Sequence, residues 1–198
     1  MTEVDFWYDF ASTYSYPAAM HIGELAERRD VRIAWRPFLL GPIFAGQGWN
    51  NSPFNLYPAK GRYMWRDLER ICHRLQLPLQ TPDPFPQNSL LAARVALALA
   101  TEERPDFSRA VYRAEFGARR PIAKPATIAE LLGEMGLAPG EILERAASEP
   151  IKSSLRRQTE EARQLGIFGA PTLTTKDGEL FWGNDRLEEA LNWAVEAQ

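Results

Sequence analysis

The amino-acid sequence predicts an α/β fold in which a long helical segment interrupts a small sheet. Segments with strand character lie near both ends of the chain, and the stretch between them has helical periodicity. The order at the start is strand–helix–strand, which favours a parallel strand pair joined by a right-handed crossover. The order at the end is strand–strand–helix, so an antiparallel hairpin would complete the sheet.

The first strand is expected at Val4–Phe10, which is short, aromatic and rich in residues that favour strands. A helix follows, because Ala18, Ile22 and Ala26 recur on one face. The pattern then changes at Val31–Leu39, which alternates like a second strand.

A loop is expected over Gly41–Pro58, which is rich in Gly, Pro and Asn. A loop of this length is more often a binding loop than a linker. Prolines punctuate the segment that follows. Helices are expected there at Gly61–Leu75, Asn88–Thr101, Asp106–Ala118, Thr127–Met135, Pro139–Ala147 and Glu149–Leu165.

Strand character returns at Pro171–Trp182, where Lys176-Asp177-Gly178 is expected to form the turn of a hairpin. An amphipathic helix beginning at Asn184 closes the chain. This order of elements is that of a thioredoxin-like fold with a large all-α insertion domain. Residues 1–40 and 166–198 would form the thioredoxin-like domain, and residues 41–165 the binding loop and helical insertion.

The composition narrows the class of protein. The chain of 198 residues has a net charge of -3 from interleaved charges, so no nucleic-acid partner is expected. Its longest apolar stretch, Leu90–Ala100, contains Arg94 and is too short to span a membrane. The N-terminal residues lack the features of a signal peptide, and there is one cysteine. Both observations favour the reducing cytoplasm.

The cysteine and the histidines do not predict a reactive site. His21 and His73 lie far apart without metal-ligand spacing, so no metal site is expected. Cys72 stands in register with Leu68 on an apolar helix face, and adjacent helix residues do not face each other. We therefore interpret Cys72 as a core residue. A single cysteine also argues against a dithiol oxidoreductase, which cycles between a dithiol and a disulfide.

The segment Ser12-Thr13-Tyr14-Ser15, at the start of the first helix, has two interpretations. Serine and threonine are common helix caps. The same helix end would also stabilise an anion such as a thiolate, which a serine hydroxyl could hold ready as a nucleophile. Pro17 lacks the backbone donor that a helix capped by Ser12 would need, so the helix could instead start near Ser15.

Two further segments have a structural and a binding interpretation. Pro171 is either an ordinary strand-entry proline or a cis-proline that leaves the Ala170 backbone free to bind an extended peptide. Lys60 is either a solvated surface residue or, with Asn51, the partner of a bound carboxylate.

The segment before the last helix is also ambiguous. Asp185 followed by Glu188 matches a capping box, which would be purely structural. Asn184 and Asp185 could equally bind the carboxylate and the ammonium of an amino-acid head group.

Together these segments resemble one protein family. They are "FWYDFASTYSY", "NNSPFNLYPAKGRY", "GIFGAPT" and "FWGNDRLEEAL". The chain resembles the 2-hydroxychromene-2-carboxylate isomerases, which are related to the kappa class of glutathione transferases in the disulfide-oxidoreductase branch of the thioredoxin superfamily. The resemblance covers essentially the whole length.

The resemblance implies that glutathione is the cofactor. Ser12, at the family's catalytic serine position, would hydrogen-bond the glutathione sulfur, although the family often has Pro where Thr13 follows. The remaining glutathione-binding residues implied are Asn51 and Lys60 for the glycyl carboxylate, Ala170 ahead of Pro171 for the cysteinyl moiety, and Asn184 and Asp185 for the γ-glutamyl group.

The implied reaction interconverts 2-hydroxychromene-2-carboxylate and trans-o-hydroxybenzylidenepyruvate, or related aromatic unsaturated keto acids. The partner would be a small aromatic electrophile, and the family implies aromatic catabolism and a homodimer. Aromatic residues that could line the pocket are Phe44, Trp49, Tyr63 and Trp182. Two alternatives stay open, namely a kappa-type glutathione transferase or peroxidase and a non-catalytic thioredoxin-like binding module.

Overall fold

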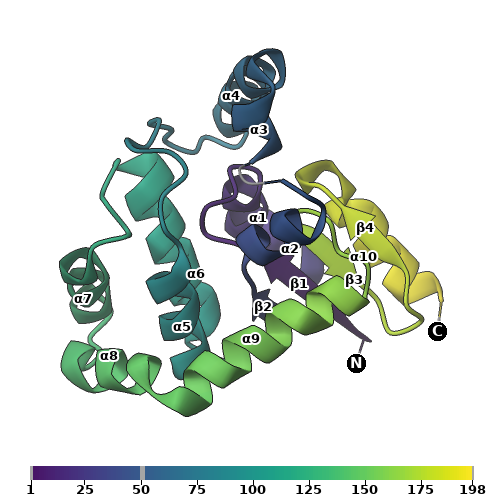
Figure 1. Cartoon of the computed structure of the whole chain (residues 1–198). Helices are drawn as coiled ribbons and strands as arrows, with labels where there is room; N and C mark the ends of the chain where they lie inside the picture. Colours follow the sequence, from purple (N-terminus) through teal and green to yellow (C-terminus); the bar gives the residue numbers. More distant parts are fainter. Residues whose placement is uncertain (1, 50–51, 198) are drawn as a thin grey trace.

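The computed structural model describes residues 2–49 and 52–197 (Figure 1). Its four-stranded sheet has the order β2-β1-β3-β4. As predicted, β1 (Thr2–Tyr8) and β2 (Val31–Pro37) are parallel and joined by helix α1 (Ser15–Glu27). The predicted hairpin is also present: β3 (Thr172–Thr174) is antiparallel to both β1 and β4 (Leu180–Trp182).

Side chains of β1 alternate between two faces of the sheet, as in any strand. Phe6 and Tyr8 enter the main core, to which α1 and the last helix, α10 (Leu187–Glu196), also contribute. Trp7 points to the opposite face and packs in a smaller cluster with Phe38 and Ala162. The sheet is therefore covered by helices on both faces, which buries the aromatic segment around Trp7.

The predicted helical insertion is present, and in Figure 1 its helices lie above the sheet, to its left and along its lower side. Prolines occupy the first position of several of them, where a missing N–H is harmless. A π-helical turn, Arg113–Gly117, extends the third of them. The helices are α4 (Pro58–Arg74), α5 (Leu90–Ala98), α6 (Arg104–Tyr112), α7 (Pro125–Glu134), α8 (Pro139–Ala147) and α9 (Glu149–Gln164).

Two local predictions were wrong. The expected loop from Gly41 contains two short helices, α2 (Leu40–Gly46) and α3 (Pro53–Leu56). Buried Ile43 of α2 packs in the cluster around Trp7, so tertiary packing overrides the low helix propensity of Gly and Pro. The closing helix does not begin at Asn184, and the capping-box interpretation of Asp185 and Glu188 is also wrong, because residues 184–186 form a 3₁₀ turn and α10 begins only at Leu187.

The division into a thioredoxin-like domain and a helical insertion stays a proposal. Helix α9, the last of the insertion, packs against β2, and its Ala162 lies in one apolar cluster with Trp7 and Phe38, so the two parts share an apolar interface. Among the described residues, no helix combines the length and apolar character needed to cross a membrane.

Candidate active site

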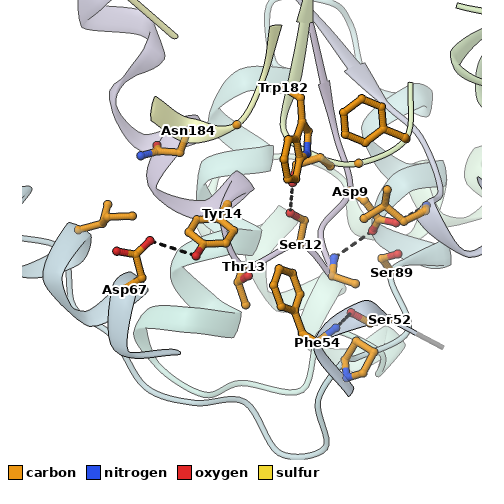
Figure 2. Close-up of a pocket in the computed structure, with 18 of the residues that line it drawn as sticks. Asp9, Ser12, Thr13, Tyr14, Ser52, Phe54, Asp67, Ser89, Trp182 and Asn184 are labelled. Atoms are coloured by element: carbon orange, nitrogen blue, oxygen red, sulfur yellow. Dashed lines mark hydrogen bonds between the residues drawn. The ribbon is translucent and has the colours of Figure 1, made fainter. Parts of the chain in front are cut away.

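Ser12 lies in the turn between β1 and α1, and two hydrogen bonds hold its side chain. The Ser12 hydroxyl donates to the backbone oxygen of Ala170 at 2.9 Å, and Ser12 Oγ accepts the N–H of Ser15 at 3.3 Å. Figure 2 shows the first of these bonds, with Ser12 between Trp182 and Phe54 in that view. Segments from the N-terminal and C-terminal parts of the chain are therefore in contact at Ser12.

Helix α1 begins at Ser15, as the alternative start predicted, and this corrects the expected anion site. The Ser15 N–H is taken by Ser12 Oγ, the Tyr16 N–H donates to the Thr13 oxygen at 3.3 Å, and Pro17 has none. Ser15 is the first helical residue, and its side chain does not cap the helix. Within the described part of the chain, the donors near Ser12 that lack a partner include the backbone N–H groups of Thr13 and Tyr14 and the buried Ser15 hydroxyl.

The loop before β3 has the cis peptide that one interpretation predicted, between Ala170 and Pro171. Because β3 starts at Thr172, the Ala170 backbone lies outside the sheet. The backbone oxygen of Pro171 accepts the N–H of Gly183 at 3.0 Å, and this hydrogen bond fixes the position of Pro171. The loop thus presents the Ala170 backbone to Ser12.

Hydrogen bonds to Asp9 stabilise the turn that contains Ser12. Its carboxylate accepts the N–H of Ala11 at 2.9 Å and the N–H of Leu40 at 2.7 Å. Its backbone oxygen accepts the Ser12 N–H and the Tyr112 hydroxyl, both at 2.9 Å. Burial raises the pKa of Asp9, although the hydrogen bonds it accepts oppose the rise. Asp9 was missed by sequence reasoning, although its position directly after a buried strand was a usable signal.

A cavity of about 1700 Å³ opens beside Ser12. Five of the predicted site residues line it, and Pro171 does not, because only its neighbour Ala170 reaches the wall. Asn51 lies outside the described residues. The residues brought together are Ser12, Lys60, Ala170, Asn184 and Asp185, and the aromatics Phe44, Trp49, Tyr63 and Trp182 also line the cavity.

The predicted head-group residues, Asn184 and Asp185, both line this cavity. Asn184 Oδ1 is buried and has no hydrogen-bond partner among the described residues. A buried acceptor left in this state is costly, so Asn184 Oδ1 is available to a donor from outside the described chain. The Asp185 carboxylate is exposed and lies against Gly183, whose φ of 121° suits glycine. Lys60 is exposed in the first turn of α4.

Other lining residues were not predicted. The Tyr14 hydroxyl donates to Asp67 of α4 at 3.0 Å, and Arg70 donates to the same carboxylate at 3.3 Å. Phe54 lies near Tyr14, with ring centroids 6.2 Å apart. Tyr14 stands inside the serine motif and could have been found there. Asp67 gave no local signal, because only the packing of the chain brings α4 to this site.

The core interpretation of Cys72 is confirmed. The side chain is buried in the main core with Leu68, and burial raises the pKa of the thiol to about 11. A thiol in that state is a poor nucleophile. Among the described residues, no group of three or more His, Cys, Asp or Glu side chains is arranged to hold a metal ion.

Comparison with known proteins agrees with this architecture. Residues 3–192 match the family model of the DSBA-like thioredoxin domain. Glutathione S-transferase kappa 1 from Homo sapiens is 30% identical over 200 residues, which cover 93% of this chain and 87% of the relative. A 2-hydroxychromene-2-carboxylate isomerase from Sphingobium xenophagum is 31% identical over 189 residues, covering 93% and 94%.

A solved structure of a 2-hydroxychromene-2-carboxylate isomerase superimposes with a TM-score of 0.87 at 25% identity, covering 98% of this chain and 95% of that one. The match extends over the sheet, the helical insertion and the segments that carry Ser12 and Ala170. The chain therefore belongs to the DSBA-like thioredoxin family, in the group that contains the kappa-class glutathione transferases and the 2-hydroxychromene-2-carboxylate isomerases.

Proposed function

We propose that the protein is a glutathione-dependent isomerase that interconverts 2-hydroxychromene-2-carboxylate and trans-o-hydroxybenzylidenepyruvate, or a related aromatic unsaturated keto acid. The observation that carries the proposal is the hydrogen bond between the Ser12 hydroxyl and the Ala170 carbonyl in the wall of a large cavity. This bond brings the Ser12 hydroxyl next to the Ala170 backbone, which could pair with an extended peptide as an added strand would. The name of one relative, Glutathione S-transferase kappa 1, supports glutathione chemistry, and the name of another, 2-hydroxychromene-2-carboxylate isomerase, supports the isomerisation.

The residues present suit a tripeptide with a thiol. The Ala170 N–H and C=O lie outside the sheet and would pair with the cysteinyl backbone. Asn184 Oδ1, buried without a partner among the described residues, would accept from the γ-glutamyl group. The exposed Asp185 carboxylate would pair with its ammonium, and Lys60 would face the glycyl carboxylate, with Asn51 nearby in sequence.

Ser12 would exchange one hydrogen bond for another when glutathione binds. A serine hydroxyl donates one hydrogen, and in this structure Ala170 O accepts it. Turning that hydrogen toward the glutathione sulfur frees the Ala170 carbonyl to accept the cysteinyl N–H. The N–H groups of Thr13 and Tyr14, unpartnered among the described residues, would add donors around the same anion.

When bound, glutathione supplies a thiolate that adds to the electron-poor carbon of the unsaturated keto acid, allows rotation about the former double bond, and leaves as that bond reforms. The protein's part is to favour the thiolate, orient the two reactants and exclude water. Because the sulfur is released unchanged, no oxidant or reductant is consumed. The partner is a small aromatic electrophile, and we also propose a cytoplasmic homodimer acting in aromatic catabolism.

A second candidate is a kappa-type glutathione transferase or peroxidase, which one relative's name favours. It would use the same site, and the difference lies in whether the thioether leaves as product. A third candidate, a non-catalytic binding module, predicts no glutathione affinity.

The test combines calorimetric titration with glutathione and an absorbance assay on trans-o-hydroxybenzylidenepyruvate. The proposal predicts binding, isomerisation only when glutathione is present, and full recovery of the free thiol. Stoichiometric loss of thiol with chlorodinitrobenzene, without isomerisation, would favour the transferase. Absence of glutathione binding would reject both enzymes and leave the binding module.

A further inference from the structure

The two halves of helix α4 are held in the fold by different means. The second half is packed in the main core, where Leu68 and Cys72 are buried. Residues 58–64 of the first half belong to neither apolar cluster, although this half carries Lys60. In Figure 1, α4 and α3 stand apart from the other helices, above α1. The position of Lys60 therefore depends on contacts other than the apolar cores.

The short helix α3 packs closely against this first half of α4. Gly61 makes the close approach possible, because a Cβ at that position would lie 2.4 Å from the backbone oxygen of Phe54. The Phe54 ring in turn lies near the Tyr14 ring, with centroids 6.2 Å apart. Helices α3 and α4 therefore form one unit, and α3 contacts the segment that carries Ser12.

The two residues that directly follow Ser12 bind α4 through their side chains. The Thr13 hydroxyl donates to Met64 Sδ at 3.1 Å, and both of these side chains are buried. The Tyr14 hydroxyl donates to Asp67 Oδ2 at 3.0 Å, as Figure 2 shows. The segment that presents Ser12 to the cavity is therefore also the segment that contacts the first half of α4.

Lys60 lies on the side of α4 that makes these contacts. Residues four and three positions apart lie on one side of a helix, so Lys60, Met64 and Asp67 form one row. Lys60 stands about 6 Å along the helix axis from Met64, one turn closer to the start of the helix. Both Lys60 and Ser12 line the cavity. The contacts of α4 with the Ser12 segment therefore set where Lys60 stands relative to Ser12.

The Tyr14 contact is lasting, because the hydroxyl keeps its hydrogen. Burial, followed by the charge and the hydrogen bond of Asp67, raises the pKa of Tyr14 above its usual 10.0. The Asp67 carboxylate also accepts a hydrogen bond from Arg70 at 3.3 Å, which holds it in place for Tyr14.

We propose that Thr13 and Tyr14 are positioning residues that act through α4, placing Lys60 to bind the glycyl carboxylate of a glutathione whose sulfur lies at Ser12. The inference rests on the proposed function, since that function assigns the carboxylate to Lys60. Thr13 and Tyr14 then fix the separation between the two ends of the ligand, and the site favours thiols that carry a carboxylate at that separation.

Two ligands that differ by one charge test this role without turnover. Glutathione and its ethyl ester at the glycyl carboxylate share the same tripeptide and thiol, so the ratio of their dissociation constants reports the carboxylate's contribution. We expect the wild-type protein to bind glutathione about five-fold more tightly than the ester, as measured by calorimetric titration. Lys60→Met should bring this ratio close to one, which sets the lower limit.

The variants are Thr13→Val and Tyr14→Phe, alone and combined. Valine keeps the branched shape of Thr13 without its hydroxyl, and phenylalanine keeps the ring of Tyr14 next to Phe54. Each variant should lower the ratio, and the combined variant should bring it near the value of Lys60→Met. Affinity for the ester should stay at the wild-type level, because the residues that bind the rest of the tripeptide are unchanged.

Two controls separate positioning from general damage. Arg66→Gln removes the ion pair of Arg66 with Glu69 at 2.6 Å on the same helix, but Arg66 does not line the cavity, so this variant should keep the wild-type ratio. In a protein that already carries Lys60→Met, the combined change of Thr13 and Tyr14 should alter the ratio no further, since residues that act through one another are not additive.

The outcomes separate this inference from the function on which it rests. A ratio that stays at the wild-type value in Thr13→Val and Tyr14→Phe would overturn the positioning role, and so would an equal loss of affinity for both ligands. A wild-type ratio of one would also overturn it, because Lys60 would then not bind the carboxylate, while glutathione binding itself would stand. Binding of neither ligand to the wild-type protein would reject the proposed function and this inference with it.

Discussion

At the scale of single residues, the site depends on which groups already have hydrogen-bond partners. Ser12 can donate only once, and Ala170 takes that hydrogen while no thiol is bound. Asn184 Oδ1 is buried and still lacks a donor within the described chain. In the proposed function these two residues would differ in role: Ser12 would exchange a partner when glutathione binds, and Asn184 would gain one.

Replacing Ser12 with Ala removes the donor for the sulfur and should lower isomerase turnover on the order of 100-fold, as loss of one preorganised donor does. Glutathione affinity should change less, because Asn184, Asp185 and Lys60 remain. Ultraviolet absorbance of the bound thiolate as a function of pH measures the effect, with exposed Ser153→Ala as control. Wild-type thiolate formation and turnover in Ser12→Ala would remove Ser12 from the mechanism.

Replacing Gly169 with Ala should displace the Trp182 indole, because the added Cβ has no room. We expect a loss of about 1–3 kcal/mol in the free energy of unfolding, the usual cost of overpacking. Gly140→Ala is the control: its Cβ would meet nothing within 4 Å in helix α8, and it should stabilise by about 0.5–1 kcal/mol. Urea denaturation distinguishes the two, and equal effects would contradict the clash.

At the scale of elements, Asp9 ties three segments together at the end of β1. Its carboxylate binds the N–H groups of the Ser12 turn and of the start of α2, and its backbone oxygen binds Tyr112 of α6. Helix α2 has no side-chain cap of its own. The position of α2 relative to Ser12 thus depends on one buried carboxylate.

Asp9→Asn should test that dependence. An amide has one acceptor oxygen, so either the Ala11 or the Leu40 N–H would face an NH₂ group. Leaving a buried donor unpaired costs about 1–3 kcal/mol of unfolding free energy, measurable by denaturant titration. The exposed Asp106→Asn should cost less than about 0.5 kcal/mol, and a similarly small loss in Asp9→Asn would show that the carboxylate is dispensable.

At the scale of the whole molecule, an aromatic core joins the sheet to the helical insertion. Tyr8 of β1 lies 6.3 Å from Tyr112 of α6, and Tyr112 stacks on Phe116 at 6.4 Å, both measured between ring centroids. Glu115 belongs to the π-helical turn, and its side chain is fully buried, with 0% exposure. Neither of its carboxylate oxygens has a partner among the described residues. Burial raises the pKa of Glu115 well above the usual 4.5, and the charge of Asp9 adds to the rise.

This raised pKa makes stability depend on pH with a definite sign. Above pH 4.5 the unfolded chain releases the Glu115 proton and the folded protein keeps it, so stability falls as pH rises toward the folded pKa. Glu115→Gln removes that penalty. Between pH 4.5 and the raised folded pKa, the variant should gain about 1.4 kcal/mol of unfolding free energy relative to wild type for each pH unit, and it should gain nothing below pH 4.5.

Chemical denaturation on the acid side of pH 4.5 and again near neutrality measures this difference. The exposed Glu144→Gln should differ from wild type by less than about 0.5 kcal/mol at both pH values. A Glu115→Gln effect that is independent of pH would show that Glu115 does not titrate differently in the folded state.

Most of the fold was predictable because its signals are local. Alternation over Val31–Leu39 and proline at helix starts depend only on neighbouring residues, and α8 at Pro139–Ala147 has the predicted bounds. The helix in α2 was not predictable, because Ile43 is held by Trp7 and Phe38 from other segments. The capping box failed for the same reason, since Gly183 bonds to Pro171 and directs residues 184–186 into a 3₁₀ turn.

By itself, the sequence determined the order of the elements, the parallel start and the hairpin at the end, and the motifs that carry Ser12, Ala170 and Asn184. The tertiary structure alone decided how these motifs meet: the Ser12 hydrogen bond to Ala170, the Asp9 contact with α2, and the Phe168–Trp182 pair beside them. The physical reason is the sequence separation over which each kind of interaction acts. Periodicity and propensity act over a few residues, whereas the bond from Ser12 joins positions 158 residues apart and forms only once the sheet is assembled.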